Sequence, residues 1–88
     1  MKAEELIKAI GEPMRYRILQ QLLLRKHCVR SLSKKMGVTE SAISQHLKVM
    51  KEAGLVYGEK YGYHTHYYPS REAVDLLADT FKAMQRQS

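Results

Sequence analysis

The chain has few residues that could form covalent or metal links. It has one cysteine, Cys28, and no tryptophan among 88 residues. A single cysteine excludes a disulfide framework within one chain and a zinc site built from cysteines alone. No apolar run reaches the roughly 18 residues that a membrane-spanning helix needs, and the first residues do not form a signal peptide. We therefore expect a cytoplasmic protein without a membrane partner.

The sequence also lacks the residue patterns of common active sites. No Ser/His/Asp set, carboxylate pair or glycine-rich phosphate loop is evident. Ser44, Gln45 and His46 are adjacent but would lie on one helix, with no residue to orient the histidine as a base. A single small domain is also too short for most enzymes with a buried active site. We expect a protein that is not an enzyme and that needs no cofactor.

Positive charge is what the chain has in excess. Its 15 Lys and Arg oppose 9 Asp and Glu, which gives a net charge of +6. Residues 1–29 and 30–60 each carry six basic and three acidic side chains, whereas residues 61–88 carry three of each. Such an excess favours a polyanionic partner, because Lys and Arg displace the counterions of a phosphate backbone. The same excess also occurs on ordinary solvated surfaces. The order of the residues along the chain must therefore distinguish a polyanion-binding surface from a merely solvated one.

Apolar residues at helical spacing fill most of the chain, and a short alternating segment follows them. The pattern predicts helices that begin near Ala3, Pro13, Ser31, Glu40 and Arg71. Residues 55–68 are predicted to form a β-hairpin that turns at Gly62-Tyr63, and residues 27–29 could pair as an edge strand. The fold class is mainly α with a small hairpin, in the order α-α-α-α-β-β-α, as one domain of residues 1–88.

Residues 30–53 have the spacing of a helix-turn-helix. Ser33 is small where the two helices approach each other, Gly37 stands at the turn, and Ile43 is apolar where the second helix packs back. With a hairpin of residues 55–68 after it, this unit predicts a winged helix-turn-helix. A helical hairpin without a nucleic-acid role is the alternative.

The exposed face of the helix at residues 40–53 carries short polar side chains first and lysines later. Ser and Gln can bond base edges in the major groove, and Lys can bond phosphates. His46 could belong to either face of this helix. The predicted DNA contacts are Thr39, Ser41, Ser44, Gln45, His46, Lys48 and Lys51, with Lys60 and Tyr63 on the wing.

Two stretches resemble the ArsR/SmtB metalloregulators. Residues 12–19, EPMRYRIL, resemble that family's DPTRLRIL opening, and residues 38–56, VTESAISQHLKVMKEAGLV, are similar to its LSQSAVSHHLKVLREAGLV block. The resemblance covers about residues 4–68. It implies a homodimeric transcriptional repressor that binds a palindromic operator in double-stranded DNA, with dimer contacts between the first and last helices.

The last helix, about residues 70–86, supports a dimer independently. It has two neighbouring apolar stripes, which is too broad an apolar surface for one small core. Its balanced charge suits a protein partner better than DNA. The predicted dimer interface comprises Leu6, Ile10, Val74, Leu77, Phe81 and Met84.

The metal sites of the resembled family are incomplete in this chain. Metal-sensing members often carry Cys-Val-Cys or Cys-Val-x-Asp where this chain has Cys28-Val29-Arg30-Ser31. Arg30 would repel a metal ion, and Ser31 replaces the aspartate. In the last helix, neither possible alignment places a set of zinc ligands. We expect no metal site, with Cys28, His64 and His66 as the remaining candidate ligands.

Two alternatives to a DNA-binding repressor stay open. One is a winged-helix module that binds another protein through the last helix and the wing. The other is a metal- or thiol-responsive repressor that uses Cys28 or the histidines, because Lys26, His27 and Arg30 could lower the pKa of the thiol. The effector, if there is one, is not identified by the sequence.

Overall fold

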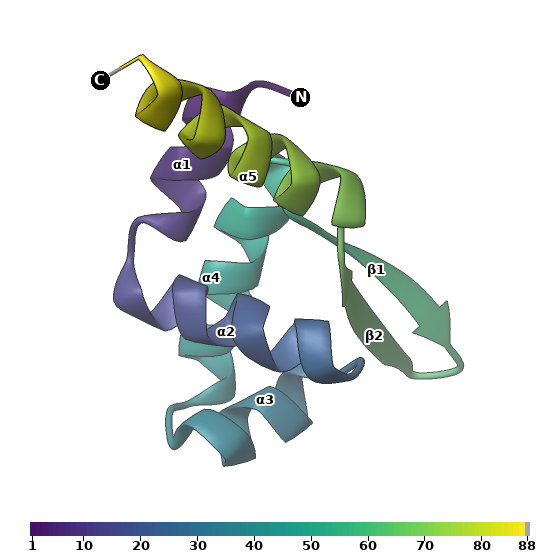
Figure 1. The fold of residues 1–88 in the computed structure, drawn as a ribbon. Helices are drawn as coiled ribbons and strands as arrows, with labels where there is room; N and C mark the ends of the chain where they lie inside the picture. The colour runs from purple at the N-terminus through teal and green to yellow at the C-terminus, as the bar shows by residue number, and fades with distance from the viewer. Residues whose placement is uncertain (88) are drawn as a thin grey trace.

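The computed structural model describes residues 1–87, so Ser88 of the predicted domain lies outside the described residues. The element order is the predicted one, five helices with a two-stranded antiparallel hairpin before the last (Figure 1). The elements are α1 (Ala3–Ile10), α2 (Pro13–Leu24), α3 (Val29–Met36), α4 (Glu40–Glu52), β1 (Val56–Tyr61), β2 (His64–Pro69) and α5 (Arg71–Arg86). No helix among residues 1–87 is long and apolar enough to cross a membrane.

Side-chain caps explain where the helices begin. The Thr39 hydroxyl accepts a hydrogen bond from the Ala42 amide at 3.1 Å, and the Ser70 hydroxyl accepts one from the Ala73 amide at 3.2 Å. Both satisfy amides that have no partner in the first turn of a helix. Helices α4 and α5 therefore begin at Glu40 and Arg71, where the sequence predicts them to begin.

Helix α3 begins two residues earlier than predicted because Cys28 caps it. The Ser31 amide donates to Cys28 Sγ at 3.4 Å, and the Cys28 amide donates to Ser31 Oγ at 3.1 Å. This reciprocal pair is a capping box, with a thiol where serine or threonine is usual. Cys28 is half-buried, and its sulfur serves as the cap of α3.

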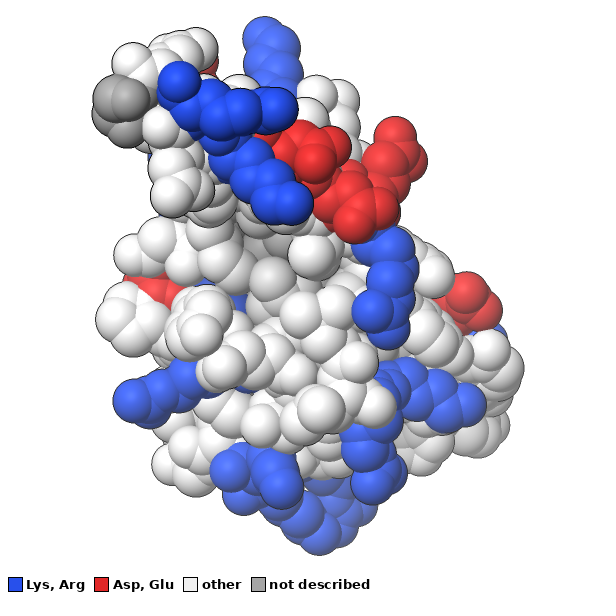
Figure 2. Space-filling model, in the orientation of Figure 1, with Lys and Arg blue, Asp and Glu red and all other residues white. Residues whose placement is uncertain are grey.

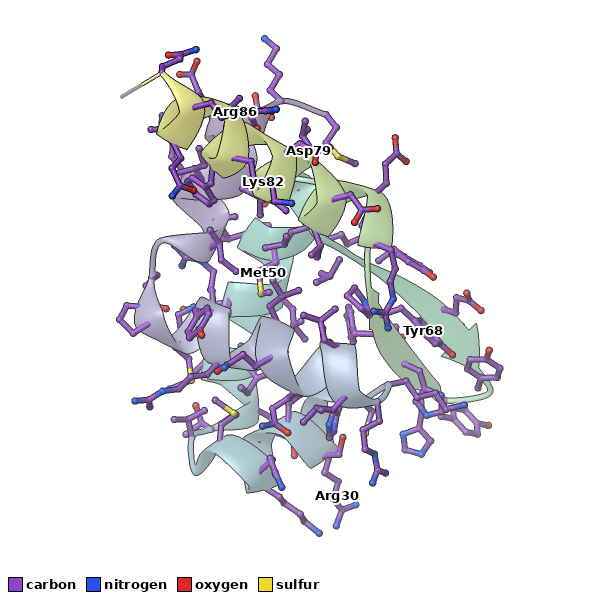
Figure 3. All side chains as sticks on the ribbon, in the orientation of Figure 1. Arg30, Met50, Tyr68, Asp79, Lys82 and Arg86 are labelled. Carbon is purple, nitrogen blue, oxygen red and sulfur yellow. The ribbon has the colours of Figure 1, made fainter. Side chains whose placement is uncertain are left out.

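Helix α4 runs through the middle of the molecule. Helix α5 lies across α1 at one end, α3 lies at the other end, and α2 crosses α4 between them (Figure 1). Ile43, Leu47 and Met50 of α4 are at most 2 % exposed, and Figure 3 shows Met50 among the packed elements. The rest of the buried apolar core consists of Leu6, Ala9, Ile18, Leu19, Leu22, Leu32, Leu55, Val56, Ala73 and Leu77.

The hairpin pairs Val56 with Pro69 at its base and Tyr61 with His64 at its tip. It turns at the predicted Gly62-Tyr63, with φ of 64° at Gly62. The edge strand expected at residues 27–29 is reduced to one bridge, in which the Tyr67 amide donates to the His27 carbonyl at 2.7 Å. This bridge fixes β2 against the segment that connects α2 to α3.

Gly37 makes the turn between α3 and α4. Its backbone is left-handed, with φ 71° and ψ 29°, and its amide donates to the Ser33 carbonyl at 3.0 Å. The Ser33 hydroxyl donates to the Val38 carbonyl and holds the other side of the turn. Glycine is the usual residue in this conformation after a helix.

We expect Gly37→Ala to lower the free energy of unfolding by about 1 kcal/mol, because an L-residue is strained at positive φ. A Cβ at this position would meet no atom within 4 Å, so the cost arises in the backbone alone. Gly37→Asn should cost less, since asparagine tolerates this conformation. Urea unfolding of the two variants measures the difference, and equal stabilities would contradict the interpretation.

Candidate nucleic-acid interface

One face of α4 is exposed to solvent. The buried residues Ile43, Leu47 and Met50 hold the opposite face. The residues of α4 that were predicted to meet DNA and that the structure leaves exposed are Ser41, Ser44, Gln45, Lys48 and Lys51. Their spacing places them along one side of the helix. The structure thus supplies an exposed polar surface, and their contact with DNA remains a prediction.

Thr39 is exposed just before this face. Its hydroxyl oxygen accepts from the Ala42 amide, so the side chain has a structural role at the start of α4. The hydroxyl proton is still free to donate to an acceptor outside the chain. A DNA contact by Thr39 therefore stays a prediction alongside its capping role.

His46 is turned away from the fully exposed face of α4, and its contact with DNA stays a prediction. Its side chain is 25 % exposed, and its Nδ1 lies 3.7 Å from Glu12 Oε2 and 3.4 Å from Arg15 Nη1. Both partners are at the start of α2. His46 turns toward α2 because its position on the helix lies between the buried stripe and the exposed face.

Arg15 connects helices in a way that the sequence did not reveal. Its Nε donates to the Ala9 carbonyl and its Nη2 donates to the Lys8 carbonyl at 3.5 Å, so the guanidinium covers the last carbonyls of α1. The same side chain reaches His46 on α4. Arg15 therefore joins three helices, which a rigid guanidinium fork can do and a single ammonium cannot.

Glu12 completes this cluster. Its carboxylate accepts from the Arg15 amide at 3.0 Å and so caps α2. Loss of solvent alone would raise the pKa of Glu12, but the amides of Arg15 and Met14 and the nearby His46 and Arg15 side chains lower it below its ordinary value. The cap is therefore ionised at neutral pH, and its contribution to stability is lost only as the pH falls through this lowered pKa.

The wing presents Lys60 and Tyr63 to solvent near its tip. Lys60 is exposed opposite Thr65, and Tyr63 is 105 % exposed in the turn. Tyr67, on β2, packs partly against the core. Tyr57, by contrast, is 47 % exposed and stacks on Tyr68 with ring centroids 5.4 Å apart.

The outer face of the wing is a cluster of aromatic rings. Tyr61 lies against His66 with centroids 4.9 Å apart, and Lys26 lies 5.4 Å from the Tyr61 ring centroid. Hydrogen bonds to the Tyr68 hydroxyl and to Glu59 raise the pKa of Tyr61 to about 12. These contacts join the wing to the segment between α2 and α3.

The candidate metal ligands are not gathered into a site. Among residues 1–87, no group of three or more His, Cys, Asp or Glu is placed to hold a metal ion. The Ser31 amide, which donates to Sγ, lowers the pKa of the Cys28 thiol. His64 is exposed and His66 packs on Tyr61. That the protein holds no metal remains a prediction.

The predicted dimer residues fall into three groups, which are buried, partly buried and exposed. Leu6 is fully buried and Leu77 is 7 % exposed, because α1 and α5 pack on each other within one chain. They belong to the core of the single chain, and their place in a dimer interface stays a prediction. Ile10 and Val74 are partly buried against that core. Phe81 and Met84, in the C-terminal half of α5, are 50 % and 59 % exposed and remain uncovered.

Comparison with known proteins places this architecture in a family. Residues 12–57 match the family described as bacterial regulatory protein, arsR family. The chain is 40 % identical over 77 residues to the HTH-type transcriptional repressor SmtB of Mycobacterium tuberculosis, covering 88 % of this chain and 51 % of that protein. The chain thus spans about half the length of this relative.

Solved structures have the same fold. A crystal structure of a possible transcriptional regulator for arsenical resistance superposes with a TM-score of 0.83 and 32 % identity, covering 91 % of this chain and 83 % of that one. The homodimeric winged helix-turn-helix DNA-binding domain of Mb0332 from Mycobacterium bovis superposes with a TM-score of 0.79 and 21 % identity, covering 96 % and 79 %. The fold is therefore a winged helix-turn-helix.

We expect Arg15→Lys to lower the free energy of unfolding by about 1 to 2 kcal/mol, because lysine keeps the charge but cannot make all three contacts. Arg17→Lys is the matched control, since Arg17 is exposed on the same helix. Chemical denaturation at one protein concentration measures both. Equal stability of the two variants would show that the Arg15 cluster does not hold the helices together.

Proposed function

Because the chain belongs to the arsR family of bacterial regulatory proteins, we propose that it is a sequence-specific, DNA-binding transcriptional regulator that acts as a homodimer. The observation that carries this proposal is the exposed polar face of α4 on a helix whose other side is buried. Its Mycobacterium tuberculosis relative is named a repressor, and we extend that activity to this chain. The family consists of transcriptional regulators, so we propose no catalysis, and we place the protein in the cytoplasm with its DNA.

In this proposal α4 enters the major groove. Gln45 can bond adenine with two hydrogen bonds, and Ser41 and Ser44 can donate to or accept from base edges. Lys48 and Lys51 follow one and two turns later, where the helix would pass the phosphates. The short side chains at the start of α4 allow close approach to the bases.

The wing supplies a second contact. Lys60 and Tyr63 stand near the tip of a hairpin that is tied to the body of the domain through the His27–Tyr67 bridge. We propose that Lys60 bonds a phosphate and that Tyr63 lies against the sugar-phosphate backbone beside the site read by α4. Because the wing is fixed, these contacts would set the position of α4 in the groove.

A second copy of the chain would cover Phe81 and Met84. Apolar side chains exposed in the C-terminal half of α5 favour association, because they stay in contact with water as long as the chain is a monomer. Two-fold pairing presents two α4 helices related by symmetry, which matches a palindromic operator. The operator in this proposal is therefore double-stranded DNA with two inverted half-sites.

The function is tested with a DNA fragment selected from genomic DNA by the wild-type protein. We expect Ser44→Ala combined with Gln45→Ala to lower the affinity for this fragment roughly tenfold to a hundredfold, since a bidentate base contact contributes about 1 to 3 kcal/mol. Affinity for unrelated DNA should change little. Fluorescence anisotropy measures both.

Gln20→Ala, an exposed glutamine on α2, is the control for this experiment and should bind like the wild type. If the wild-type protein binds no DNA at low salt, the proposed function is wrong. If it binds but the double variant keeps its preference for the selected fragment, α4 is not the helix that reads the sequence.

The proposed dimer interface is tested by introducing a negative charge on α5. Phe81→Glu should raise the dimer dissociation constant about 30-fold or more, because a buried interface position does not tolerate an unpaired carboxylate. Lys82→Glu introduces the same side chain at the next position of α5, which lies outside the stripe formed by Phe81 and Met84. This control variant should dimerise like the wild type. Sedimentation equilibrium distinguishes them, and a Phe81→Glu protein that dimerises like the wild type would refute this interface.

A further inference from the structure

The positive charge of the chain is not carried by the elements that read DNA in the proposed function. Helix α4 has Lys48 and Lys51 against Glu40 and Glu52, and the wing has Lys60 against Glu59. Both elements are therefore neutral. Residues 13–39, which form α2, α3 and the segments after them, contain seven Lys and Arg and no Asp or Glu. This segment accounts for the net charge of +6.

Part of this charge surrounds one cleft. The cleft lies between the end of α2 and α3 and has a volume of about 430 Å³. Its charged lining consists of Arg25, Lys34 and Lys35, all exposed, and no acidic residue lines it. Among residues 1–87, none of these three side chains forms an ion pair. Three unpaired cations around one hollow form a surface suited to an anion.

His27 lines the same cleft and is 7 % exposed. Burial lowers the pKa of His27 below its ordinary value, and the charges of Arg25 and Lys35 lower it further. The histidine is therefore neutral at neutral pH. Arg25 and Lys35 therefore lie near the buried ring of His27, and all three residues line the same cleft.

The basic surface and the start of α4 lie at the same end of the molecule. Figure 2 shows Lys and Arg gathered over the region where Figure 1 places α3, and Figure 3 shows Arg30 extending from that end. Only the turn at Gly37 separates α3 from α4. A DNA strand that borders the groove entered by α4 would therefore pass close to α3.

We propose that the cleft between α2 and α3, with Arg25, Lys34 and Lys35, binds the phosphate backbone of DNA beside the groove that α4 enters. This inference rests on the proposed function and extends it. It divides the interface into a neutral helix that reads bases and a basic cleft that supplies most of the electrostatic attraction. Specificity and affinity would then depend on different residues.

The test is the salt dependence of DNA binding. The cleft variant, Arg25→Gln/Lys34→Gln/Lys35→Gln, removes the three charges of the cleft. The control variant, Lys2→Gln/Lys8→Gln/Arg71→Gln, removes the same amount of charge at the other end of the molecule, from the residue before α1, the last turn of α1 and the first residue of α5. For each protein, anisotropy gives the slope of log K against log salt concentration. Each phosphate contact contributes about 0.9 to this slope for duplex DNA.

We expect the cleft variant to have a slope shallower by roughly 2 to 3 and to lose affinity for selected and unrelated DNA equally. The control variant should keep the wild-type slope to within about 0.5. Thermal unfolding of both variants checks that they fold as the wild type does. A cleft variant with the wild-type slope, or a control with an equally reduced slope, overturns the proposal.

A second experiment distinguishes a cleft that binds the phosphates of DNA from one that binds free inorganic phosphate. The wild-type protein is titrated with inorganic phosphate at constant ionic strength while NMR follows the residues of the cleft. Saturation at millimolar phosphate, together with an unchanged DNA slope in the cleft variant, would mean a small-anion site and overturn the DNA assignment. Absence of any DNA binding by the wild type would overturn the proposed function as well, whereas a changed slope only in the cleft variant supports both.

Discussion

The burial of one side of α4 is the constraint on which the rest of this structure depends. Ile43, Leu47 and Met50 are enclosed by α1, α2, α3 and the hairpin. Each such side chain contributes about 1.5 to 3 kcal/mol when it leaves water, so the helix cannot turn about its axis without a large loss. The direction of its polar face follows from this, and a fixed direction is what a helix needs to read a groove.

The cluster of Glu12, Arg15 and His46 adds a directional contact to this apolar packing. Arg15 covers the end of α1 and reaches α4, while Glu12 caps α2. Apolar packing by itself tolerates small rotations, whereas hydrogen bonds hold only at defined distances and angles. Because α1 also packs on α5, the cluster lies between the helices assigned to the dimer and the helix assigned to the bases.

The distribution of charge gives the two ends of the molecule different chemistry. The end with α1 and α5 carries balanced charge and leaves Phe81 and Met84 uncovered. The other end carries the uncompensated cations of α2 and α3. An end without net charge that exposes apolar side chains favours a second protein chain, and a basic end favours a polyanion. One small domain can therefore hold both kinds of surface without interference between them.

The sequence determined the features that depend on neighbours within one or two turns. The caps at Thr39 and Ser70, the left-handed turn at Gly37 and the two sides of α4 could be predicted because each involves residues three or four positions apart. Tertiary structure decided the rest. His46 meets Arg15 across 31 positions, Leu6 is covered within its own chain, and Arg25 joins Lys34 and Lys35 around one cleft. Which residues meet across such separations depends on how the helices cross, and that is set by the packing of the whole core.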